Sequence, residues 1–128
     1  MNKLDKESVI GISALLVHAA NIDEIYSDHE KDLVKNFIIS YLKDDDPSEI
    51  LKKAEEVEKN SNQLLNYTNI IKQKSSDIKK DVIEHLWRVI ISDKTIDQYE
   101  SNLMRRVCGL IYFSDKECAE IKLKLLDS

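Results

Sequence analysis

An eight-residue motif that is typical of a turn between two helices occurs twice in this chain, seventy residues apart, and it restricts the fold more than any other feature. The first copy is Asp23-Glu-Ile-Tyr-Ser-Asp-His-Glu30 and the second is Asp93-Lys-Thr-Ile-Asp-Gln-Tyr-Glu100. In each copy an Asp is followed at the third position by an apolar residue, then by Ser or Asp, and three positions later by Glu. Such a cap residue with Glu three positions on is the capping box that begins many helices. Because each copy also separates two apolar runs, we predict a duplicated helix-loop-helix unit.

The same register continues into the flanking helices. A shift of seventy residues places apolar residues on apolar residues, in the pairs Leu16/Leu86, Leu33/Leu103, Val34/Met104, Phe37/Val107 and Tyr41/Ile111. Two Gly and one Pro leave few residues for hairpin turns, which disfavours strands. A length of 128 residues suits one domain with its own core. We therefore predict a single all-α bundle of about seven helices over residues 1–128, with an internal repeat of about 8–60 and 77–127.

Cap residues and apolar spacing locate the individual helices. The predicted spans are about 5–20, 28–43, 47–60, 63–72, 77–92, 98–112 and a last helix capped by Ser114 with Glu117. The first has almost no polar face, so we expect it in the middle of the bundle, with His18 as a core residue. Trp87, Cys108 and Cys118 also read as core residues.

Charge and motif content exclude several classes of protein. The net charge of −5 and the absence of a concentrated basic face argue against a nucleic-acid-binding module. Val9 to Ala20 imitates the apolar part of an export signal, but acids among the preceding lysines remove the positive bias, and the run is too short to span a bilayer. We therefore expect a cytoplasmic protein that does not insert into membranes.

No catalytic pattern is complete. His29-Glu30 begins like the zincin motif, but Leu33 occupies the position of the second His. The chain has no Gly-rich phosphate loop and no Ser nucleophile elbow. Cys108 and Cys118 match neither the spacing of a zinc site nor that of a thioredoxin-like site. We expect no catalytic residues and no enzyme activity.

The two acidic corners are the candidate site, with two competing interpretations. In the structural interpretation, their acids cap helices and accept loop N–H groups. In the functional interpretation, they supply hard oxygen ligands to a divalent cation, the only cofactor that we consider. The candidate metal ligands are Asp23, Glu24, Glu30, Asp93, Asp97 and Glu100. The corners are not EF-hands, because Ile25 and Asp28 stand where that loop needs an acid and a Gly.

One stretch of the second half resembles a known family. Leu86-Trp-Arg-Val-Ile-Ile-Ser-Asp93, continued by Ile96-Asp-Gln-Tyr-Glu100 and Leu103-Met-Arg-Arg-Val107, is similar to the second block of the tellurite-resistance protein B family, the TerB-like domain. Residues 14–30 resemble its first block, and the likeness extends over about 8–126. It implies a bacterial all-helical domain in two related halves, linked to tellurite resistance and stress responses. The domain occurs alone or joined to other modules, DnaJ-like co-chaperones among them, and has no established catalytic activity.

This chain departs from the family at both corners. The family usually has Asp-Gly there, whereas Glu24 and Lys94 occupy the Gly positions, so ligand geometry that depends on the family's turn does not carry over directly. The resemblance implies a non-catalytic binding or adaptor domain, with a protein partner, a membrane-associated complex or a second copy of the chain as candidate partners. Two alternatives remain open: a structural or oligomerising scaffold that uses a helix face, and a hydrolase whose clustered carboxylates hold a metal-bound water.

Overall fold

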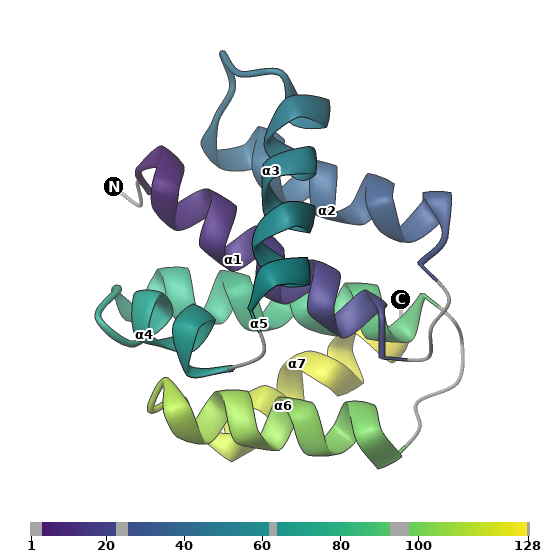
Figure 1. Cartoon of the computed structure of the whole chain (residues 1–128). Coiled ribbons are helices and arrows are strands. Elements are labelled where there is room, and N and C mark those ends of the chain that lie inside the picture. The colour runs from purple at the N-terminus through teal and green to yellow at the C-terminus, as the bar shows by residue number, and fades with distance from the viewer. Residues whose placement is uncertain (1–3, 23–25, 62–63, 93–97, 128) are drawn as a thin grey trace.

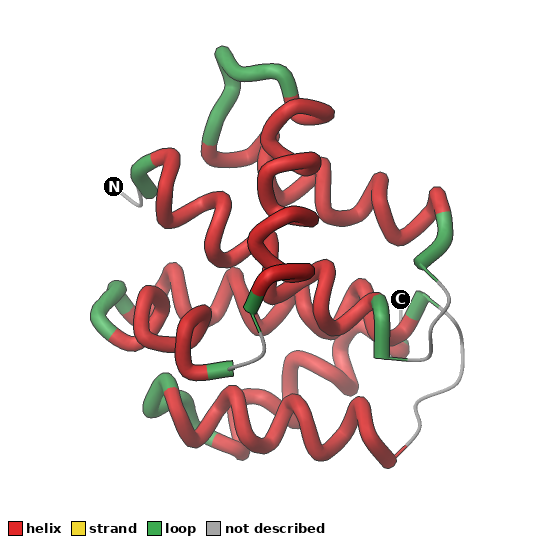
Figure 2. The backbone as a smooth tube through the Cα atoms, in the orientation of Figure 1, coloured by secondary structure: helices red, strands yellow, loops and turns green. Residues whose placement is uncertain are grey.

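The computed structural model describes residues 4–22, 26–61, 64–92 and 98–127, with the backbone alone at 98–100. Seven helices occupy these residues, and the described part contains no strand (Figures 1 and 2). They are α1 (Lys6–Ala20), α2 (Asp28–Tyr41), α3 (Pro47–Asn60), α4 (Leu65–Lys72), α5 (Ser76–Ile91), α6 (Gln98–Leu110) and α7 (Asp115–Leu126). The all-α prediction is confirmed.

Helix α1 is the central element, as its composition predicts. It contacts α2, α3, α4 and α5, and α3 crosses it in Figure 1. A helix that is apolar on all sides gains most when neighbours cover every face. Accordingly, its apolar side chains are almost completely buried, including Val9, Ile12, Ala14, Leu15, Leu16, Val17, Ala19 and Ala20.

The second half of the chain packs around α5. This helix contacts α1, α2, α4, α6 and α7, while α6 also contacts α4 and α7. Trp87 is 4% exposed, and its indole Nε1–H donates a hydrogen bond of 3.1 Å to the carbonyl oxygen of Cys118 in α7. The core position predicted for Trp87 is confirmed, and its hydrogen bond satisfies the one polar group that burial would otherwise leave unpaired.

Local capping chemistry sets the helix starts. Ser27 and Glu30 form the predicted capping box at α2, and Asp46 accepts the Ser48 N–H beside Pro47 at α3. Ser75 and Ser114 cap α5 and α7 through their hydroxyl oxygens. Each cap satisfies a backbone N–H that the helix itself leaves without a partner.

Two helix starts in the first half recur at the same spacing in the second half. Helices α1 and α5 begin seventy residues apart, and so do α2 and α6. The common origin of the halves stays a prediction. Within the described residues, no helix is both long and apolar enough to cross a lipid bilayer.

Candidate functional site

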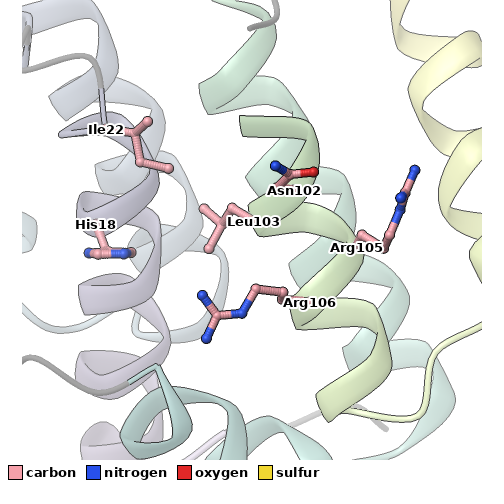
Figure 3. A pocket seen from close by; sticks show the side chains of 6 residues that line it. All are labelled: His18, Ile22, Asn102, Leu103, Arg105 and Arg106. Atoms are coloured by element: carbon pink, nitrogen blue, oxygen red, sulfur yellow. The ribbon is translucent and has the colours of Figure 1, made fainter. Parts of the chain in front are cut away.

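A pocket of about 590 Å³ lies between the C-terminal end of α1 and the side of α6 that faces it (Figure 3). Its lining combines apolar and polar side chains, two arginines among them: His18, Ile22, Asn102, Leu103, Arg105 and Arg106. Ile22 is the last described residue before the first acidic corner, and Asn102 follows Glu100 by two positions. The pocket therefore lies next to the chain segments that carry both corners.

The amphipathic pattern of α6 produces this lining. Leu103, Met104 and Val107 are buried and hold α6 against the domain, which leaves Asn102, Arg105 and Arg106 on the exposed side. In Figure 3 the Arg106 guanidinium extends into the space between α6 and α1, whereas Arg105 projects away from that space. The side chains of the two neighbouring arginines therefore point toward different surfaces.

The opposite wall of the pocket carries His18. Its Nδ1 lies 3.4 Å from Glu58 Oε2 of α3, and Asn21 Nδ2 donates to the other Glu58 oxygen at 3.4 Å. The His18 side chain is 40% exposed, so its predicted role as a core residue is wrong. The reason is that His18 lies on the side of α1 that faces Glu58 of α3 and the pocket, whereas Val17 and Ala19 on either side of it are buried.

The pocket has the chemistry of an anion site with an apolar floor. Among the described residues, no carboxylate forms an ion pair with Arg105 or Arg106. A guanidinium can grip a carboxylate or phosphate through two parallel hydrogen bonds. Ile22 and Leu103 would cover an apolar stem attached to such a group.

Of the six candidate metal ligands, only Glu30 has a described side chain. Asp23, Glu24, Asp93 and Asp97 lie outside the described residues. Glu100 lies in the first turn of α6, but only its backbone is described. The metal-site prediction for these five residues stays a prediction.

Glu30 is 1% exposed and takes part in the capping box of α2. Its Oε1 accepts the Ser27 backbone N–H at 2.9 Å and the Ser27 hydroxyl at 3.0 Å, while the Glu30 N–H donates to Ser27 Oγ at 3.2 Å. The predicted capping role of Ser27 and Glu30 is confirmed. A metal bound by Glu30 would have the second carboxylate oxygen available, because Ser27 uses the first.

The surroundings of the first corner are negative. Burial raises the pKa of the Tyr26 hydroxyl, and the carboxylates of Glu55, Glu30 and Glu58 raise it further. No group of three or more His, Cys, Asp or Glu side chains in the described part of the chain is arranged to hold a metal ion. The described residues therefore place carboxylates near Tyr26, with the Lys31 ammonium 5.1 Å from the Tyr26 ring centroid, but they supply no complete ligand set.

Comparison with known proteins identifies the family. Residues 10–123 match the family model described as tellurite resistance protein TerB. No curated protein and no solved structure matches the chain. The match covers nearly the whole sequence and agrees with the all-helical fold, so the chain belongs to the TerB family.

Proposed function

We propose that this chain is a non-catalytic adaptor domain of a tellurite-resistance or general stress-response system, and that it binds an acidic segment of a partner protein in the pocket between α1 and α6. Membership of the TerB family supports the first part. The observation that carries the second part is the position of the Arg106 guanidinium, which extends into the space between α6 and α1 that Ile22 and Leu103 also line, without an ion pair to another described residue.

A partner segment that combines a carboxylate with an apolar side chain fits this lining best. The carboxylate would pair with Arg106, and the apolar side chain would lie on Ile22 and Leu103. Because Arg106 is exposed, its attraction acts through solvent and should weaken as salt is added. A lysine-rich segment offers Arg106 no carboxylate and would lose this pairing.

Binding of synthetic peptides tests this proposal. Fluorescence anisotropy would compare a labelled peptide of Glu and Leu with its counterpart in which Lys replaces every Glu. We expect only the acidic peptide to bind, and Arg106→Gln to weaken its binding about tenfold through loss of a charge-assisted hydrogen bond. The control is Lys53→Gln, which removes an exposed cation on α3, away from the pocket lining. Equal affinity of the wild type and Arg106→Gln would contradict the proposal.

We also propose that the acidic corners bind a divalent cation weakly. The support is the ligand pattern at Asp23, Glu24, Asp93 and Asp97, together with the negative surroundings of Tyr26. Thermal melts of chelator-treated protein with calcium, magnesium, manganese and zinc would measure it. Ligand at a hundred times its dissociation constant adds about 2.7 kcal/mol to the free energy of unfolding. We expect Asp23→Asn and Asp93→Asn to abolish the gain; a midpoint that no cation changes would rule out the site.

One observation favours the alternative function of a scaffold or oligomerising domain. Leu123 and Leu126 lie three positions apart on α7, and they are 60% and 48% exposed. Two exposed leucines on one helix face are a small apolar patch of the kind that a second copy could cover. Light scattering over a range of protein concentrations would detect self-association, and Leu123→Gln should abolish it if this face is used.

A further inference from the structure

A second pocket lies on the opposite flank of α6, where this helix meets α5 and α7. Its volume is about 430 Å³, and its lining includes Trp87 of α5, Met104 and Arg105 of α6, and Lys122 of α7. Helix α6 therefore lies between two pockets, this α7 pocket and the α1 pocket described above.

Helical geometry divides the side chains of α6 between the two pockets. With about 3.6 residues per turn, neighbouring positions differ by about 100° around the helix axis. Leu103 and Arg106 accordingly line only the α1 pocket, while Ser101 and Met104 line only the α7 pocket. Arg105 borders both, but in Figure 3 its side chain projects away from α1, on the side where α7 lies. Each flank of α6 therefore carries one guanidinium.

Lys122 adds a second cation to the α7 pocket. Its Nζ lies 5.3 Å from the centroid of the Trp87 ring. The Trp87 indole is itself fixed by its hydrogen bond of 3.1 Å to the Cys118 carbonyl, so the ammonium group lies against a rigid aromatic surface. Neither Arg105 nor Lys122 forms an ion pair with a described carboxylate. Within the described residues, both charges are therefore available to a ligand.

The charge pattern favours an acidic ligand on both flanks. Residues 101–110 of α6 include two arginines and no Asp or Glu. The chain as a whole has a net charge of −5, so an acidic ligand is repelled by the protein at large and attracted only where cations gather. In the α7 pocket, the Asp115 carboxylate offsets part of this attraction. Trp87 and Met104 supply apolar surface there, as the apolar residues do in the α1 pocket.

The exposed side of α6 between the two pockets carries no bulky side chain other than the arginines. Asn102 and Gly109 are exposed there, and a Cβ at Gly109 would meet no atom within 4 Å. An α-helix with its side chains is about 10–12 Å wide. A flexible chain of about four residues has an end-to-end distance of about 10–12 Å. A short peptide can therefore reach from one pocket to the other.

We propose that one acidic segment of the partner crosses α6 and is held on both flanks. One carboxylate pairs with Arg106 in the α1 pocket, and a second, about four residues away, pairs with Arg105 and Lys122 in the α7 pocket. This goes beyond the proposed function, on which it rests, because that function concerns the α1 pocket alone. The second contact is intramolecular once the first has formed, so it raises the affinity through effective concentration.

Three peptides of equal length, blocked at both ends, test the crossing. The first has one Glu-Leu pair followed by Gly and Ser; the second has two Glu-Leu pairs separated by about four Gly and Ser residues; the third has the composition of the second with the two pairs adjacent. NMR titration of the isotope-labelled full chain would measure their dissociation constants. We expect the spaced peptide to bind about tenfold more tightly than the single-pair peptide. The adjacent-pair peptide should gain much less, because its carboxylates cannot span the helix.

Variants of α7 isolate the second contact. Lys122 does not line the α1 pocket, so Lys122→Gln should weaken binding of the spaced peptide and leave that of the single-pair peptide unchanged. Asp115→Asn removes the opposing carboxylate and should strengthen binding of the spaced peptide alone. Lys124→Gln, at an exposed lysine of the same helix outside the pocket lining, is the control and should change neither. Arg106→Gln should weaken binding of both peptides.

The crossing and the proposed function fail in different ways. Binding of the single-pair peptide that depends on Arg106, with no gain from the spaced second pair, would overturn the crossing and leave the proposed function intact. A gain that the adjacent-pair peptide shares in full, or that persists in Lys122→Gln, would also overturn the crossing, since general charge attraction would explain it. Failure of all three peptides to bind would overturn both.

Discussion

Glu30 shows how one buried carboxylate can be both a candidate ligand and a structural necessity. Its sequence context fits either interpretation, because capping and cation binding both need carboxylate oxygens near a helix start. The geometry shows that at least one of its oxygens is used by Ser27. The capping role could be predicted from sequence since it involves residues three positions apart, whereas a metal site depends on how distant segments meet.

We predict that Ser27→Ala lowers the free energy of unfolding by about 1–2 kcal/mol, because it removes the cap and leaves Glu30 with one donor fewer. Urea denaturation followed by circular dichroism would measure the change. Ser48→Ala is the control: this exposed serine contributes its backbone N–H to the Asp46 cap, and alanine keeps that group. A loss for Ser27→Ala no larger than that for Ser48→Ala would contradict the cap assignment.

A second polar cluster ties α2 to α5. The Tyr41 hydroxyl donates to Asp81 Oδ2 at 2.6 Å, and His85 Nδ1 donates to the Asp81 carbonyl at 2.8 Å and lies 3.4 Å from Oδ1. Burial would lower the pKa of His85, but the hydrogen bonds and charge of Asp81 outweigh it and raise the pKa above 6.5, with Arg88 opposing. Burial would likewise raise the pKa of Asp81, but His85 and Tyr41 lower it below 3.8.

These shifts predict a pH dependence of stability. Because the folded state holds the His85 proton more tightly than the unfolded state, the stabilisation is complete below pH 6.5 and is lost as pH rises through the higher folded pKa. The Asp81 contribution is present above 3.8 and is lost on acidification. Urea midpoints should therefore fall as the pH rises above 6.5, and His85→Gln should remove that part of the fall. His29→Gln, at an exposed histidine, is the control and should retain it; identical profiles for His85→Gln and the wild type would refute the prediction.

At the scale of helices, the starts and the central position of α1 could be predicted, whereas the neighbours of individual side chains could not. Asp46-Pro47 and Ser114 begin their helices as expected, because cap chemistry is local. His18 lines a pocket instead of the core because its surroundings come from α3 and α6, elements that the periodicity of α1 does not specify.

The two glycines give a matched test of helix packing. Both lie within helices, where alanine gains about 0.5–1 kcal/mol over glycine. A Cβ at Gly109 would meet no atom within 4 Å, whereas one at Gly11 would collide with Ile70 Cδ1 of α4. We therefore predict that Gly109→Ala raises the thermal midpoint and that Gly11→Ala gains less, because Ile70 must shift. A larger gain for Gly11→Ala would show that α1 and α4 are not packed closely at this point.

At the scale of the whole molecule, the candidate site depends on the meeting of the two halves. Helix α1 of the first half and α6 of the second form the walls of the pocket, so neither half alone contains it. The two copies of the corner motif lie close in sequence to residues of this pocket, but their acidic residues predict a cation site. The cationic lining comes from Arg105 and Arg106, whose sequence context leaves open a solvated helix face, ion pairs with the corner acids and a surface for an acidic partner.

Mapping where an acidic partner binds tests the central claim most directly. Backbone NMR spectra of the isotope-labelled chain would be recorded as the Glu and Leu peptide is added. We predict that the largest shifts occur at the pocket lining, at His18, Ile22, Leu103 and Arg106, and that Arg106→Gln suppresses them. Shifts concentrated instead around Leu123 and Leu126 on α7, or their absence throughout, would contradict the account.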